Sequence, residues 1–294
     1  MKNDWFTWKS EREFKILYKH AYQGRLFIIL FLVIICACWF EFLVEHIFPL
    51  VLDIIKPLNQ SRPKKINLDV EYYVNQDENY FWITLHICHT NTVMITIIVS
   101  TDAIFIAFLY HACGELSILG FKLKNIGKRN CNQWNADKNI MQEIKFCAKK
   151  HDSLLMFISG ICNCFSTRYF IVVGCTVILL ISAGVQIMMN LSQLNMESVL
   201  SRFIFCHIFH VFCINFSCQR LTNHSLQFFR NIYDGYWYEL SNNNQKMILM
   251  IMIRSTKQCK FTGGKLYTFT MSNFAMILNM SLSYLNILKF LTTI

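Results

Sequence analysis

Five apolar stretches, each long enough to cross a lipid bilayer, constrain this chain more than any other feature. A membrane-spanning helix needs about 20 largely apolar residues, and such runs occupy residues 26–50, 83–111, 169–190, 199–219 and 266–290. The chain is 54% hydrophobic and 16% charged, whereas ordinary soluble domains carry about 25% charged residues. There is no sustained alternation of apolar and polar residues of the kind that a β-barrel needs. The sequence therefore predicts an all-α, polytopic membrane helix bundle with five spans.

Lysine and arginine are concentrated in three of the segments outside the spans. Residues 1–25, 112–168 and 220–265 are rich in both, whereas residues 191–198 contain neither. Because cytoplasmic loops carry the excess of Lys and Arg, we predict that the three basic segments are cytosolic. The net charge of +10 is then an orientation signal, and no nucleic-acid partner is predicted.

Residues 51–82, 191–198 and 291–294 are correspondingly predicted to be extracellular, with the N-terminus inside and the C-terminus outside. Two glycosylation sequons fall in or beside these segments, at Asn59 and at Asn190. We predict Asn59 as the glycosylation site, because Asn190 lies close to a span. Basic residues in the first outer loop oppose this orientation: Lys56, Arg62, Lys64 and Lys65.

The cytosolic segments themselves contain helical patterns that are too polar to span a membrane. Apolar residues recur every three or four positions on one stripe, formed by Ile140, Ile144, Cys147, His151, Leu154 and Ile158. A second stripe is formed by Leu226, Phe229, Tyr233 and Tyr236. We expect these helices to extend the spans into the cytosol or to pack on a partner.

No combination of residues in the sequence points to catalysis or to a bound metal. A nucleophile, a base and an orienting group cannot be proposed together, so the chain is not predicted to be an enzyme. Cys206, His207, His210 and Cys213 have helical spacing and zinc-ligand chemistry, but their apolar surroundings favour packing. We predict no metal, no cofactor and free cysteines.

Three acidic residues lie within the predicted spans, where a charge is costly and a function is the default expectation. Asp102 is the clearest case, and it could pair with an inner lysine or with polar helix atoms; its role is left open. Glu41 and Glu45 lie one turn apart near the outer end of their span, where they are either functional or reach interfacial water.

Several short motifs follow one another in the C-terminal tract. They are a Trp-Tyr pair, a Gln-Lys pair, an Arg-Ser-x-Lys segment, a Gly-Gly pair opening the last helix and a Ser-Tyr-Leu triplet, which start at Trp237, Gln245, Arg254, Gly263 and Ser283. In content and order they resemble the terminal block of insect odorant receptors. Members of this family are odorant-gated cation channels with seven helices, so the resemblance implies the same architecture.

The resemblance also implies how the five spans correspond to the family's helices. They match the third to seventh, and the start at Met1 to Trp5 resembles an Asp-Trp motif in the inner loop before the third. We therefore expect an N-terminally truncated chain, either a gene-model fragment, a short isoform or a pseudogene product.

By the same resemblance, the last span lines an ion pore. An apolar constriction can gate by dewetting, and Ile287 and Leu291 match the family's gate positions, with Phe290 at a pore-facing position and Ser283 one turn before. The alternative is that these side chains face lipid.

The resemblance further implies a ligand pocket in the outer half of the bundle and a subunit anchor on the inner side. A pocket for small volatile molecules is mostly apolar with a few polar groups, and packing is the alternative role for each candidate. The pocket candidates are Trp39, Phe42, His86, Thr90, Met94, Phe205 and Phe209. The anchor candidates, for which local packing is also an alternative, are Trp237, Tyr238, Gln245 and Lys246.

These observations predict an odorant receptor that acts as the ligand-tuning subunit of a heteromeric, odorant-gated, non-selective cation channel. Its partners would be the odorant receptor coreceptor in a heterotetramer, small volatile odorants and membrane lipid. Its location would be the plasma membrane of olfactory sensory neuron dendrites. The alternatives are a gustatory receptor, whose closing motif is absent here, and a non-functional fragment or pseudogene product.

Overall fold

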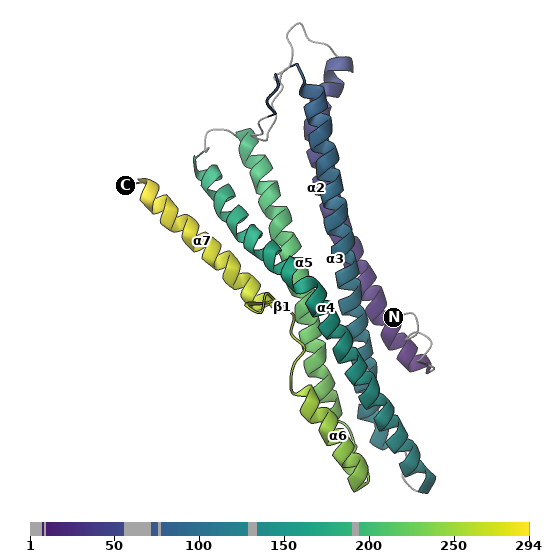
Figure 1. Cartoon of the computed structure of the whole chain (residues 1–294). Helices are drawn as coiled ribbons and strands as arrows, with labels where there is room; N and C mark the ends of the chain where they lie inside the picture. The colour runs from purple at the N-terminus through teal and green to yellow at the C-terminus, as the bar shows by residue number, and fades with distance from the viewer. Residues whose placement is uncertain are drawn as a thin grey trace.

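The computed structural model describes residues 8, 10–55, 72–75, 78–128, 134–189 and 194–293 of the chain. Labels follow Figure 1. The helices are α2 (Glu11–Ile55), α3 (Tyr80–Asn125), α4 (Trp134–Met189), α5 (Leu194–Tyr233), α6 (Asn242–Ser255) and α7 (Met271–Thr293), with short 3-10 turns η1 (Ile126–Lys128) and η2 (Trp237–Glu239). The strands β1 (Thr262–Gly263) and β2 (Tyr267–Thr268) are two residues each. The prediction of an all-α membrane helix bundle is confirmed.

The long helices run roughly along one axis, and α7 diverges from them. Figure 1 shows α2 beside α3, α4 crossing α5 near the middle of the molecule, and α7 leaving the bundle from that crossing. Short α6 lies at the opposite end of the molecule from the C-terminal end of α2 and the N-terminal end of α3. Within the described residues, α2, α3, α4 and α5 are long and apolar enough to cross a membrane.

The fifth predicted span differs from the other four. Helix α7 has 23 residues, which at 1.5 Å per residue is about 34 Å and enough for the hydrocarbon core. It is shorter than the other long helices, and Asn273, Asn279, Asn286 and several serines lie among its apolar residues. Four helices in the described residues are thus long and apolar enough to cross a membrane, and α7 is a further helix of spanning length.

Glycines allow α2 and α5 to approach α3 closely. A side chain at Gly24 would meet the Tyr110 ring at 2.9 Å, one at Gly114 would meet Leu17 at 3.0 Å, and one at Gly120 would meet Asn231 at 3.0 Å. These positions lie in the half of the molecule toward α6. The three helices consequently form a tight unit there.

An aromatic cluster fills the centre of the molecule and fixes the chain before α7. The rings of Phe105, Tyr169, Phe261 and Phe269 are buried, and Phe105 lies 4.6 Å from Tyr169 and 5.1 Å from Phe261 between ring centroids. Phe261 and Phe269 flank the β1–β2 hairpin. Helices α3 and α4 therefore hold the base of α7 through ring packing.

The hairpin corrects the predicted start of the last helix. The sequence predicts a helix opening at Gly263–Lys265 and a span over residues 266–290, but α7 begins at Met271. Gly264 and Lys265 have φ values of 57° and 60°, which suit a tight hairpin turn and not a right-handed helix. Ser166 of α4 secures this turn, because its Oγ donates to the Thr262 carbonyl at 2.8 Å and accepts from Gly264 N–H at 3.0 Å.

The two predicted inner stripes lie on α4 and α5, except for Tyr236, which follows α5, and they differ in burial. All six residues of the first, from Ile140 to Ile158, are buried on α4. On α5 the buried residues are instead Leu221, Ser225, Phe228 and Ile232, while Tyr233 is 63% exposed. The reason is that α5 lies between α3 and α4, and Phe228 stacks on His151 of α4 at 4.6 Å, which turns the Phe229–Tyr233 pair outward.

Candidate functional site

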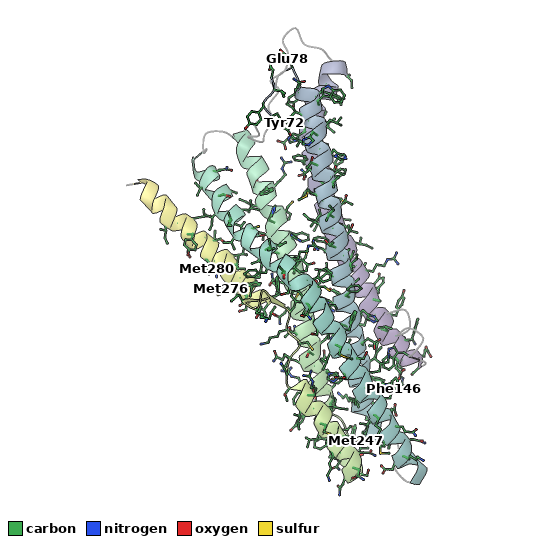
Figure 2. The ribbon with its side chains drawn as sticks, in the orientation of Figure 1. Tyr72, Glu78, Phe146, Met247, Met276 and Met280 are labelled. Atoms are coloured by element: carbon green, nitrogen blue, oxygen red, sulfur yellow. The ribbon has the colours of Figure 1, made fainter. Side chains whose placement is uncertain are left out.

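One face of α7 forms a shallow groove that no other described element covers. The groove has a volume of about 550 Å³. Its lining residues repeat every three or four positions along the single helix: Ser272, Ala275, Met276, Asn279, Met280, Ser283, Tyr284 and Ile287. Met276, Met280, Tyr284 and Ile287 are each at least half exposed, and Figure 2 labels Met276 and Met280 on the side of α7 away from the bundle. We call this set the groove face.

The opposite side of α7 is attached to the bundle. Phe274 is buried and its ring lies 5.8 Å from that of Phe212 on α5. Farther along, Leu285 occupies the space that a side chain at Gly184 of α4 would need. Helix α7 thus packs against the bundle along one side and is exposed along the other.

The groove face is uncharged and mixes apolar side chains with neutral polar ones. Ser272, Asn279 and Ser283 offer hydroxyl and amide groups, which can exchange hydrogen bonds with water, and no described lining residue carries a charge. Ile287 follows them toward the C-terminal end as an exposed apolar residue. The face can therefore border a hydrated passage that ends at an apolar ring if equivalent helices surround it.

The structure places the four predicted pore and gate residues on one helix. Ser283 and Ile287 both lie on the groove face. Phe290 and Leu291 belong to α7, but their side chains lie outside the described residues. The pore role of all four stays a prediction.

Asp102 is the centre of a buried polar network that joins three helices. Its carboxylate is fully buried on α3. Tyr169 Oη donates to Oδ1 at 2.8 Å, Arg168 Nη2 lies 3.2 Å from the same oxygen, and His210 Nε2 lies 2.6 Å from Oδ2. The partners are thus an arginine and a tyrosine of α4 and a histidine of α5, instead of the inner lysine considered from the sequence. Because Tyr169 also belongs to the aromatic cluster, the network is continuous with the support of α7.

A second ionic contact ties α2 to α5 toward the end of the bundle opposite α6. Arg202 Nη2 lies 2.5 Å from Glu45 Oε2, and Arg202 Nη1 lies 3.6 Å from Glu41 Oε2. Each of these side chains keeps some exposure. The two glutamates singled out from the sequence are therefore ion-pair partners of one arginine.

The predicted pocket residues form several separate groups. Phe205 and Phe209 stack at 6.1 Å on α5, and Phe209 reaches Phe31 of α2 at 6.3 Å. On α2, Phe42 lies 4.3 Å from the His46 ring, and Trp39 is half-buried with an Nε1 that has no hydrogen-bond partner among the described residues.

The remaining pocket candidates, on α3, are exposed. Tyr72 Oη lies 3.0 Å from His86 Nδ1, and Thr90 donates to the His86 carbonyl at 2.9 Å. Met94 is 55% exposed. Within the described residues, these side chains and those of α2 and α5 do not close around one cavity, so the pocket stays a prediction.

The predicted anchor residues surround the start of α6. Gln245 Nε2 donates to the carbonyls of Tyr238 and Leu240, each at 2.8 Å. Trp237 is half-buried and donates to the Tyr233 carbonyl at 3.1 Å, whereas Tyr238 is 59% exposed and Lys246 is exposed. Gln245 thus has a clear internal role, and the exposed residues present a surface. The predicted glycosylation site, Asn59, lies outside the described residues.

The sequence reasoning missed some of the polar residues that organise these regions. Arg202, the partner of Glu41 and Glu45, sits in an apolar span and could have been found as a charge in a membrane segment. Asp137 accepts from Asn244 Nδ2 at 2.6 Å and from Ser241 Oγ at 2.9 Å, and so joins α4 to the start of α6. No periodicity in the sequence signals that contact.

Four helices that are long and apolar enough to cross a membrane define a multi-pass membrane protein. Residues 6–282 match the family described as 7tm odorant receptor. The chain therefore belongs to the odorant receptor family, which confirms the resemblance seen in the C-terminal motifs and favours an odorant receptor over a gustatory one.

Curated relatives agree with this assignment. Odorant receptor 10 of Aedes albopictus is 28% identical over 91 residues, which are 31% of this chain and 24% of that protein. Odorant receptor Or2 of Anopheles gambiae is 21% identical over 178 residues, 60% of this chain and 47% of that protein. The matches thus span less than half the length of either relative.

Solved structures show the same fold. The insect olfactory receptor OR5 from Machilis hrabei in complex with eugenol matches with a TM-score of 0.78 at 11% identity, covering 94% of this chain and 68% of that one. OR5 from Machilis hrabei, in a further structure, matches with a TM-score of 0.75 at 12% identity, covering 93% and 67%. At such identities the likeness concerns the fold alone.

Proposed function

We propose that this odorant receptor is the ligand-tuning subunit of a heteromeric, odorant-gated, non-selective cation channel, with α7 lining the pore. The observation that carries the proposal is the groove face of α7, which is uncharged, partly polar and uncovered within the described residues. Ser283 donates to the Asn279 carbonyl within the helix, but an asparagine amide that faced lipid would lack hydrogen-bond partners. Water in a central passage would supply those partners.

A single copy of α7 cannot enclose a passage, so the proposal requires further subunits. Four equivalent helices around an axis, contributed by this chain and the odorant receptor coreceptor, would bring their groove faces together. Ser272, Asn279 and Ser283 would then line the wide part of the passage, and Ile287 would form its narrow apolar constriction. The proposed orientation has the N-terminus in the cytosol, in the plasma membrane of olfactory neuron dendrites.

Odorant binding is proposed for the outer half of the bundle, between α2 and α5. One of the matched OR5 structures is a complex with eugenol, a small volatile molecule. In the present chain, Phe205 and Phe209 supply apolar rings on α5, and the Trp39 indole of α2 has a donor without a partner among the described residues. That combination suits a small molecule with one hydrogen-bond acceptor. Binding would favour the open arrangement of α7 over the closed one.

Recording ionic currents from cells that express the chain with the coreceptor tests this proposal. Ile287→Ser removes the apolar constriction, so we expect the current without ligand to rise several-fold because a polar ring no longer dewets. Leu282→Ser is the matched control: Leu282 is an exposed leucine of the same helix that lies off the groove face. Equal basal currents in Ile287→Ser and wild type, with both complexes at the cell surface, would contradict the pore assignment.

The anchor is tested separately by co-purification. Trp237→Ala is expected to reduce recovery of the chain with the coreceptor, because the half-buried indole shapes the surface beside α6. Normal co-assembly of this variant would remove Trp237 from the proposed interface without affecting the pore assignment.

A further inference from the structure

A basic cleft lies between α2, α3 and α5 in the half of the molecule toward α6. Its volume is about 280 Å³. Lysine, arginine, histidine and neutral polar side chains line it, and none of the described lining residues is acidic. The residues used below are Lys19, Gln23, His20, Ser117, Arg220 and His224.

The side chains that line the cleft are held in place by their neighbours. Arg220 Nη2 donates to Gln23 Oε1 at 2.8 Å, and its guanidinium carbon lies 4.8 Å from the Tyr110 ring centroid. His224 Nδ1 lies 3.3 Å from Ser117 Oγ, and the His20 and His224 rings meet edge to face at 4.8 Å. Close packing at Gly114 brings His20 against α3.

Two polar atoms of this cleft are buried and have no protein partner in the described residues. They are Nε of Arg220 and Nδ1 of His20. A buried polar atom without a partner costs free energy, and burying a guanidinium beside an exposed lysine adds repulsion between like charges. An anion that accepts hydrogen bonds would offset both costs.

We propose that this cleft binds a phosphate group, presented by the headgroup of a phosphorylated inositol lipid. Arginine and lysine supply charge to phosphate, while the Gln23 amide supplies a group that suits an inositol hydroxyl. All six residues fall just beyond the inner ends of the predicted spans 26–50, 83–111 and 199–219. The cleft therefore lies at headgroup level in the leaflet that the proposed orientation makes cytosolic, where basic residues attract anionic lipids. The proposal goes beyond channel function, and its test measures binding only.

The test uses the full chain in nanodiscs of neutral phosphatidylcholine, titrated with a fluorescent short-chain phosphatidylinositol bisphosphate. We expect saturable binding that weakens about fivefold in Lys19→Gln, the usual effect of one basic residue near an anionic headgroup. Arg220→Gln should weaken it at least as much. Arg230→Gln, which removes an exposed charge of α5 outside the cleft, should change it less than twofold.

Competition identifies the source of the phosphate. If inositol trisphosphate or inorganic phosphate binds with the same sensitivity to Lys19→Gln while the lipid does not bind, the site holds a soluble phosphate and not a lipid. If Arg230→Gln weakens binding as much as Lys19→Gln, attraction is by general surface charge and the proposal is overturned. Absence of binding by all three probes also overturns it. Lys19 is exposed, so its variant keeps the test valid even if Arg220→Gln fails to fold.

Discussion

Gly127 occupies a place where only hydrogen fits, at the junction of η1 and η2. A side chain there would collide with the backbone carbonyl of Tyr236, and backbone cannot move aside as a flexible side chain can. Gly127→Ala is therefore expected to destabilise the chain by about 2 kcal/mol or more through overpacking, measured as a lower unfolding temperature of the purified chain.

Gly160 provides the matched control for that substitution. It lies within helix α4 with nothing within 4 Å of an added side chain, so Gly160→Ala should stabilise by about 0.5–1 kcal/mol through the higher helix propensity of alanine. A result in which both alanines shift the unfolding temperature alike would refute the steric account of Gly127.

At the level of single residues, the sequence shows which charges matter more readily than it shows which residues they pair with. Asp102, Glu41 and Glu45 stand out because charges are rare in apolar spans. Their partners do not, since Arg202 is 157 residues from Glu45 and His210 is 108 from Asp102. Only the folded arrangement of α2, α3, α4 and α5 brings these groups within reach.

Helix α6 depends on one aspartate of α4 for its position. Asp137 accepts from Ser241 and Asn244 at the start of α6, and each such bond contributes about 1 kcal/mol. Asp137→Ala should therefore increase backbone hydrogen exchange over residues 241–255. Asp152→Ala removes an exposed aspartate elsewhere on α4 and should leave exchange there unchanged. Unaltered exchange in Asp137→Ala would show that apolar packing alone positions α6.

Among the elements, the buried stripe of α4 could be predicted because one apolar face recurs with helical period. The stripe of α5 could not, because apolar residues occur on more than one side of that helix and packing between α3 and α4 selects the buried one. The β1–β2 hairpin could not be predicted from the sequence either. Glycines before an apolar run are compatible with a helix start and with a turn. Only the structure shows that Gly264 and Lys265 have positive φ values and therefore form a turn.

At the scale of the whole molecule, the Arg202–Glu45 pair links α2 to α5. Arg202→Glu places a third acid beside Glu41 and Glu45, so we expect a lower unfolding temperature in detergent. Adding Glu45→Arg should restore part of the loss, with a coupling free energy of about 1 kcal/mol in a double-mutant cycle. Reversing Lys15 to Glu, in an exposed pair with Glu11, should cost less than about 0.5 kcal/mol. Full additivity of the first two changes would contradict a direct link.

The overall architecture followed from composition and from the length of the apolar runs, because a bilayer admits few alternatives to a helix bundle. The ligand pocket did not follow in the same way. Its candidates were chosen by depth in the membrane, which fixes the level of a residue along a helix but not the direction in which the side chain points. His86, Thr90 and Met94 share a level with Trp39 and Phe42 but are exposed on α3.

The unbroken course of α4 has a mechanical consequence. With 56 residues it is about 84 Å long, far more than the roughly 30 Å of hydrocarbon that it crosses. Near one end Gly184 touches Leu285 of α7, and near the other Asp137 holds α6. Such a rod acts as a lever. Pivoting it by about 5° at mid-length displaces each tip by roughly 3–4 Å in opposite directions, so a small reorientation within the bilayer is transmitted to α7 and α6 together.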